Sequence, residues 1–202
     1  ISNAADACDK LRYEALQNSD LSKGDTDFKI KIAKDSEARL VTLSDNGIGM
    51  NKDDLIANLG TIARSGTAAM VEAVKQSGGD KSLNLIGQFG VGFYASFMIA
   101  SKVEVISRKA GDTQTWHWES DGRSGYAVRE ATGDEAKKIP SRGTHIILHL
   151  KDDAYDYLLE DKLKQIILAY SDHISVPVFV GADDKQINAA SADRKSTRLN
   201  SS

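Results

Sequence analysis

Residues 40–50 read Leu-Val-Thr-Leu-Ser-Asp-Asn-Gly-Ile-Gly-Met. The apolar first half of this stretch predicts a strand, and Asp45-Asn46-Gly47 predicts the turn that ends it. A carboxylate at such a strand end is commonly part of an ordinary turn. It can also be a buried acceptor for a ligand donor, with Gly49 allowing close approach to the backbone and Met50 packing on an aromatic face.

Glycine is concentrated in one part of the chain, with nine of its sixteen residues between Gly47 and Gly92. The densest group is Gly87-Gln88-Phe89-Gly90-Val91-Gly92, at the start of a predicted helix that continues to Ile99. Free N–H groups and the positive end of a helix favour an anion such as phosphate. The spacing fits neither the Rossmann fingerprint nor the P-loop, so a tight loop without a ligand is an equally good interpretation.

A third candidate lies at the beginning of the chain. Apolar residues at spacings of three and four predict an amphipathic helix over residues 1–18. Asn3 and Asp6 lie three residues apart on one face of it. An amide oxygen and a carboxylate can hold Mg²⁺ or its waters, although a solvated helix face is the commoner reason for such a pair.

The remaining pattern predicts an α+β fold. Closely spaced strands imply antiparallel pairing, because parallel crossovers need more chain. We expect a two-layer α/β sandwich with a mixed, mostly antiparallel sheet and helices on one face. The expected strands are residues 28–32, 40–43, 103–107, 115–119, 126–129, 145–150 and, at an edge, 176–180. Further helices are expected over residues 51–60, 68–76 and 158–170.

Composition excludes several classes of protein. The 202 residues include 26 basic and 29 acidic side chains, a formal net charge of −3, which argues against binding to nucleic acid or an acidic membrane. The longest apolar stretch, residues 91–100, is far shorter than the ~20 residues of a membrane span. The single cysteine, Cys8, excludes an internal disulfide and fits a cytoplasmic location. We expect structural roles for all four histidines.

In order along the chain, these signals resemble a known family. The resemblance is to the N-terminal ATP-binding domain of the ninety-kilodalton heat-shock chaperones, above all the bacterial high-temperature protein G type. That family belongs to the GHKL superfamily, with type II topoisomerases, MutL proteins and histidine kinases. The stretches that carry the resemblance are residues 1–7, 9–14, 45–50, 58–67, 87–97 and Gly143-Thr144.

The resemblance implies a Bergerat-type fold with an eight-stranded sheet and a Mg²⁺-ATP site. By position, Asn3 would ligate Mg²⁺, with Asp6 as a second candidate, and Asp45 would accept from the adenine amino group. The residues lining the adenine pocket would be Gly49, Met50 and Thr144. Asn58 would contact the ribose side. The residues near the ribose and phosphates would be Arg64, in place of a common lysine, and Ser65. The loop around the phosphates would comprise Gly87, Gln88, Phe89, Gly90, Val91, Gly92 and Phe93.

The resemblance also sets domain limits. Residues 1–192 would form the ATP-binding domain, with residues 60–87 as a lid that closes over ATP. The first strand of the sheet and the glutamate that acts as general base, four residues before Asn3, would lie upstream of Ile1. We therefore expect this chain to bind ATP without efficient hydrolysis, although the intact protein would be a weak Mg²⁺-dependent ATPase. Residues 193–202 are polar and patternless, and we interpret them as an artefactual tail.

The function that the resemblance implies is the ATP-driven folding of client proteins during heat shock and other stress, by a cytoplasmic homodimer. Client proteins and a second copy of the chaperone would be the partners, with no nucleic acid or membrane. One alternative is another GHKL ATPase of the MutL or topoisomerase type, which the net charge of −3 disfavours because such enzymes act on DNA. A second alternative is a nucleotide-binding module without catalysis.

Overall fold

The computed structural model describes residues 1–60, 92–181 and 185–189. The helix expected at 68–76, nearly all of the expected lid, most of the glycine loop and the tail at 193–202 lie outside these residues. Within the described part of the chain, no helix is long and apolar enough to cross a membrane.

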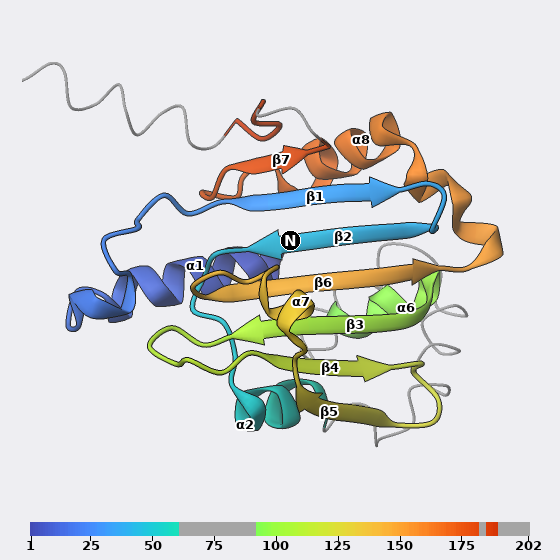
Figure 1. The fold of residues 1–202 in the computed structure, drawn as a ribbon. Helices are drawn as coiled ribbons and strands as arrows, with labels where there is room; N and C mark the ends of the chain where they lie inside the picture. The colour runs from blue at the N-terminus through green and yellow to red at the C-terminus, as the bar shows by residue number, and fades with distance from the viewer. Residues whose placement is uncertain (61–91, 182–184, 190–202) are drawn as a thin grey trace, which may run out of the picture.

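A seven-stranded sheet forms the frame of the structure, in the order β5-β4-β3-β6-β2-β1-β7 (Figure 1). All neighbouring strands are antiparallel except β1 and β7, which run parallel at one edge. The mixed, mostly antiparallel sheet is thereby confirmed, with seven strands described where the resemblance implied eight. The strands are β1 (Ile30–Asp35), β2 (Leu40–Asp45), β3 (Ala100–Arg108), β4 (Trp116–Ser120), β5 (Tyr126–Glu130), β6 (Gly143–Leu150) and β7 (Val178–Val180).

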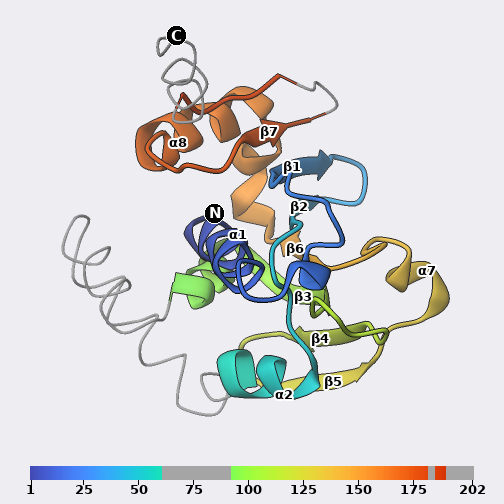
Figure 2. The same ribbon diagram turned by 90° about the vertical axis from the view of Figure 1, so that its left-hand side faces the viewer.

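Most helices cover one face of the sheet, as expected, and the short α7 (Gly133–Ala136) lies over the opposite face (Figure 2). The covering helices are α1 (Ser2–Glu14), α2 (Lys52–Leu55) with its π-helical continuation η2 (Ile56–Gly60), η3 (Gly92–Ala95), α6 (Ser96–Ile99) and α8 (Glu160–Ser171). Two 3₁₀ segments complete the described elements, η1 (Ser19–Leu21) and η4 (Asp152–Leu158).

Several element boundaries differ from the sequence prediction, and two of these differences have a clear local reason. Helix α1 ends at Glu14 rather than near residue 18, because the Asn18 side chain accepts from Asp20 N (3.2 Å) and begins η1. Strand β1 begins at Ile30 rather than residue 28, because Asn46 binds the preceding segment. The Asn46 side chain accepts from Lys29 N (2.8 Å) and donates to the residue 27 carbonyl (2.9 Å).

Helix α1 packs directly on the turn that follows β2. Its buried face comprises Ala4, Ala5, Cys8 and Leu11. The Ile48 N–H donates to the Ala7 carbonyl (3.0 Å). A Cβ at Gly47 would lie 2.6 Å from the Ala7 carbonyl carbon, closer than packed atoms approach. Glycine at position 47 therefore allows α1 to lie against the end of β2.

We predict that Gly47→Ala lowers the free energy of unfolding by about 2–3 kcal/mol, because the added methyl meets backbone that cannot move aside. Urea denaturation followed by circular dichroism measures the change. Gly133→Ala is the matched control, since a Cβ at position 133 has no neighbour within 4 Å. Equal stabilities of the two variants would contradict this account of the contact with α1.

Candidate functional site

A cavity of about 530 Å³ lies between the covering helices and the strands β2, β3 and β6. Every predicted site residue that the structure describes lines this cavity: Asn3, Asp6, Asp45, Gly49, Met50, Asn58, Gly92, Phe93 and Thr144. The other predicted site residues lie outside the described residues: Arg64, Ser65, Gly87, Gln88, Phe89, Gly90 and Val91. Residues far apart in the sequence thus share one cavity of the size of a small-molecule site.

Asp45 is the buried carboxylate of the cavity. It is the last residue of β2, it is 8% exposed, and it pairs in register with Thr144 of β6. Its Oδ1 accepts from Gly47 N (2.9 Å). Burial raises the pKa of Asp45 to about 7, although hydrogen bonds from the Gly47 and Thr144 backbone oppose this rise. A carboxylate held in this environment is a strong acceptor for a ligand donor.

Two glycines allow the backbone to close around Asp45. Gly49 has φ +67°, and a Cβ there would lie 1.9 Å from the Arg108 carbonyl oxygen. Gly143 has φ +112°, and a Cβ there would lie 2.1 Å from the Asp45 carbonyl oxygen. Larger residues would both strain the backbone and clash with it. The atoms that come close to Gly49 are backbone atoms of Arg108 and Gly143, so the approach of a ligand to Gly49 stays a prediction.

Ser107 is a site-positioning residue that sequence reasoning missed. Its buried hydroxyl accepts from Met50 N (2.9 Å), donates to the Gly143 carbonyl (2.9 Å) and lies 3.0 Å from Thr144 Oγ1. One hydroxyl therefore connects the segment after β2 with β6. One feature of the sequence could have indicated this role. Ser107 continues the inward-facing alternation of Val103 and Val105, so a polar residue stands where an apolar one is expected.

Several other residues that line the cavity are polar. Asn3 and Asp6 line it from α1 and are exposed, and Lys10 and Lys109 also line it. Lys109 Nζ lies 2.8 Å from Oδ2 of Asp54. Burial favours the neutral form of Asp54 and by itself would raise its pKa. The hydrogen bonds from Lys109 and from the Asn51 N–H outweigh burial, so the pKa of Asp54 is lowered.

A capping box at the start of α2 fixes the helix that lines this part of the cavity. The Asn51 side chain accepts from the residue 54 N–H (2.9 Å), and the Asp54 carboxylate accepts from the Asn51 N–H (3.2 Å). This capping box confirms Asn51 as the predicted N-cap. The helix continues through η2, where Asn58 lines the cavity.

Aromatic packing holds the segment that enters the cavity after the glycine loop. The Phe93 ring lies edge-on to Trp118, with centroids 5.6 Å apart, and to Tyr94 at 6.1 Å. The Tyr94 hydroxyl donates to the Leu59 carbonyl (3.2 Å). These contacts connect η3 to η2 and place Gly92 and Phe93 against the cavity.

Comparison with known proteins agrees with this geometry. Residues 2–142 match the family described as histidine kinase-, DNA gyrase B-, and HSP90-like ATPase. The chain belongs to this ATPase family. It is similar to chaperone protein HtpG of Rhodospirillum rubrum (51% identical over 197 residues), of Rickettsia rickettsii (52% over 197) and of Roseobacter denitrificans (49% over 193). Each match covers 95% of this chain, which spans only 30% or 31% of the length of these relatives.

The comparisons confirm the resemblance to ninety-kilodalton heat-shock chaperones and the GHKL-type fold. A MutL-like or topoisomerase-like identity is not favoured, because the similar proteins named above are chaperones. The roles of the individual cavity residues stay predictions.

We predict that Asp45→Asn removes a pH dependence from the stability of the nucleotide-free chain. An unfolded aspartate has a pKa of about 3.9, whereas burial raises that of Asp45 to about 7. The folded state therefore holds the proton more tightly. The stabilisation of the folded chain by this tighter proton binding is complete below about pH 4, and it is lost as the pH rises to about 7. A shift of this size corresponds to a loss of order 4 kcal/mol.

Urea denaturation at several pH values between 4 and 8 measures the difference between the wild-type chain and Asp45→Asn. Asp153→Asn, at an exposed aspartate, controls for the loss of one negative charge. A constant difference between wild type and Asp45→Asn across this range would show that Asp45 titrates normally.

Proposed function

We propose that this chain is the ATP-binding domain of a molecular chaperone that couples Mg²⁺-ATP binding and hydrolysis to the folding of client proteins. The observation that carries the proposal is the convergence of Asn3, Asp45, Asn58 and Thr144 on one cavity, with the buried carboxylate at β2. Membership of the ATPase family supports the binding of a nucleotide, and similarity to HtpG chaperones supports the chaperone function.

Asp45 would select adenine. An ionised carboxylate only accepts hydrogen bonds, so it suits the exocyclic amino group of adenine. A guanine ring carries a carbonyl at the corresponding position, which would set an acceptor against an acceptor. Thr144, oriented by its contact with the Ser107 hydroxyl, adds a polar group near Asp45, and Met50 offers a polarisable surface for the ring.

The polar residues of the cavity lining would receive the phosphates. Asn3 and Asp6 supply the amide and carboxylate oxygens that suit Mg²⁺, which would shield phosphate charge when bound. Lys10 and Lys109 add positive charge to the cavity lining. The predicted roles of Arg64, Ser65 and the loop from Gly87 to Phe93 in holding ribose and phosphates belong to the proposal.

Hydrolysis by this chain alone would be slow. Among residues 1–60, 92–181 and 185–189, the carboxylates that line the cavity are Asp6, Asp45 and Asp54. Asp45 would be occupied by adenine, and the lowered pKa of Asp54 makes it a weak base. Asp6 would serve the metal. None of the three is left as a general base for the attacking water.

The biological setting follows from the chaperone proposal. Clients would be unfolded or partly folded proteins, and the intact protein would act as a homodimer in the cytoplasm. The single cysteine, Cys8, is a buried free thiol, in keeping with a reducing compartment.

We predict that the chain binds Mg²⁺-ATP. Asp45→Asn should weaken this binding by a factor of roughly 10 to 150, because a charge-assisted hydrogen bond of about 1.5–3 kcal/mol is lost. Isothermal titration calorimetry with Mg²⁺-ATP and Mg²⁺-GTP measures the effect. The wild-type chain should prefer ATP, and Asp45→Asn should narrow that preference because its amide can donate to guanine. Asp153→Asn is the control. Near-normal ATP affinity in a folded Asp45→Asn chain would disprove the adenine assignment.

We predict that phosphate release from ATP by this chain does not exceed that of a protein-free control. A positioned base contributes typically 10²–10⁴-fold to such reactions, and none is left among the described residues that line the cavity. A coupled phosphate assay at saturating Mg²⁺-ATP tests this. Release well above the control that disappears in Asp45→Asn would show that the cavity contains a base we have not recognised.

A further inference from the structure

A cluster of charged side chains covers the face of the sheet opposite the cavity. Successive residues of a strand point to opposite faces. Val105 lines the cavity, so Glu104 lies on the other face of β3, where it pairs in register with Glu119 of β4. His117, two residues before Glu119, shares that face.

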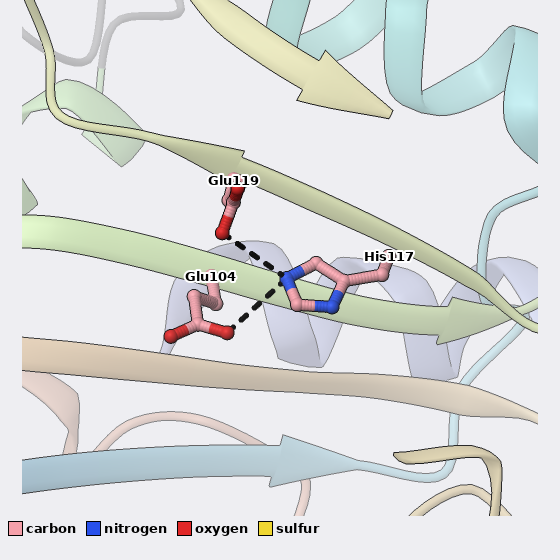
Figure 3. A group of neighbouring side chains, drawn as sticks. All are labelled: Glu104, His117 and Glu119. Carbon is pink, nitrogen blue, oxygen red and sulfur yellow. Dashed lines mark ion pairs between the residues drawn. The ribbon is translucent and has the colours of Figure 1, made fainter. Parts of the chain in front are cut away.

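Three ligand atoms converge in this cluster (Figure 3). His117 Nε2 lies 3.1 Å from Oε2 of Glu104 and 3.9 Å from Oε2 of Glu119. All three atoms lie within 4.8 Å of one another. A tetrahedral zinc ion with bonds of about 2.0–2.2 Å holds its ligand atoms roughly 3.3–3.6 Å apart. The side chains therefore already have nearly the spacing that a metal ion requires.

The imidazole of His117 supplies an independent observation. Its side chain is 2% exposed, and its Nε2 is buried without a hydrogen-bond partner of acceptable geometry. The other ring nitrogen, Nδ1, lies 2.7 Å from Oε1 of Glu135. Donation from Nδ1–H to Glu135 leaves the lone pair of Nε2 facing two carboxylates. Metal-binding histidines commonly have such a carboxylate behind them.

Glu135 is held firmly in this position. It accepts from the Thr132 N–H (2.7 Å) as part of a capping box that begins α7. Arg129 donates to both of its oxygens (2.7 and 2.8 Å). Arg129 Nη2 also lies 2.7 Å from His117 Nδ1. Without a metal ion, Arg129 can therefore support the His117 tautomer that is protonated on Nε2, with Nε2–H directed at Glu104. A metal ion would select the tautomer that is protonated on Nδ1.

Two more side chains face the carboxylates. His149 Nε2 lies 2.5 Å from Oε1 of Glu104, which leaves Oε2 of that residue for His117. Lys102 Nζ lies 2.7 Å from Oε2 of Glu119 and 3.3 Å from Oε1 of Glu104. The ammonium of Lys102 therefore occupies an oxygen that a metal ion would need, and it acts as a competitor.

We propose that Glu104, His117 and Glu119 bind a divalent transition-metal ion, zinc in first place. This proposal departs from the expectation of a structural role for His117, which stays a prediction. One imidazole nitrogen and two carboxylate oxygens suit Zn²⁺ far better than Mg²⁺, which prefers oxygen ligands alone. Three protein ligands leave a fourth position for water, and the partly exposed Glu119 side chain gives access from solvent.

The test is a titration of the nucleotide-free chain with Zn²⁺ against a chelating indicator, and with Co²⁺ by visible absorption. We expect one Zn²⁺ per chain and Co²⁺ bands typical of four ligands. His117→Gln should abolish the bands, and Glu119→Gln, at a more exposed position, should weaken Zn²⁺ binding at least tenfold. Lys102→Met should tighten Zn²⁺ binding severalfold, which a merely structural cluster would not produce.

Two controls separate this site from other metal binding. His173→Gln removes an exposed histidine outside the cluster and should leave the Zn²⁺ affinity unchanged. Asp45→Asn should lose ATP but keep Zn²⁺, so failure of the ATP proposal and failure of the zinc proposal are distinguishable. Circular dichroism verifies that each variant is folded.

The absence of Zn²⁺ binding by the folded wild-type chain would overturn the proposal. Equal Zn²⁺ affinities of the wild type and Glu119→Gln would overturn it as well. In either case His117 would be an imidazolium or a hydrogen-bonded neutral ring among carboxylates.

Discussion

The burial of the Asp45 carboxylate is the constraint on which the rest of the structure depends. A carboxylate that is 8% exposed destabilises the ligand-free fold unless its environment accommodates it. The accommodation comes from backbone: Gly47 N donates to it, and two glycines with positive φ, Gly49 and Gly143, let neighbouring segments approach it closely. Helix α1 then closes the same region through the contact of Ile48 with Ala7. The Ile1 ammonium acts on Asp45 electrostatically, but Asp45 forms no side-chain ion pair among the described residues, so the acceptor is kept available.

Local sequence signals predicted the local features of this arrangement. The spacing of Ala4, Cys8 and Leu11 gave the buried face of α1, and Asn51 was recognised as the cap that begins α2. Such features depend on residues three or four apart, which a sequence displays directly. The cavity residues far apart in sequence were assigned only through resemblance to a family, because spacing alone left Asp45 equally explicable as a turn.

Contacts across strands were beyond sequence reasoning. Ser107 connects Met50 with Gly143 only because β3 and β6 pair in a particular register. His117 looked like an isolated histidine, yet the register of β3 and β4 places Glu104 beside it, and α7 brings Glu135 behind it. A one-residue change of register would separate these groups completely, and no local pattern specifies that register.

The alternation of side chains along β3 and β4 gives the two faces of one sheet different chemistry. Trp118 packs inward against Phe93, next to the cavity, while its neighbour His117 points outward to the carboxylates. The inward residues are mostly apolar and form the floor under the helices. On the outward face, charged side chains gather beside α7, and Ile106 packs with Ile139 and Ile147 in a small apolar cluster. A ligand in the cavity would contact β3 at Val105, and a metal ion on the other face would be held by β3 and β4. Because β3 directs Val105 into the cavity and Glu104 into the cluster, it is the strand that the two proposed sites share.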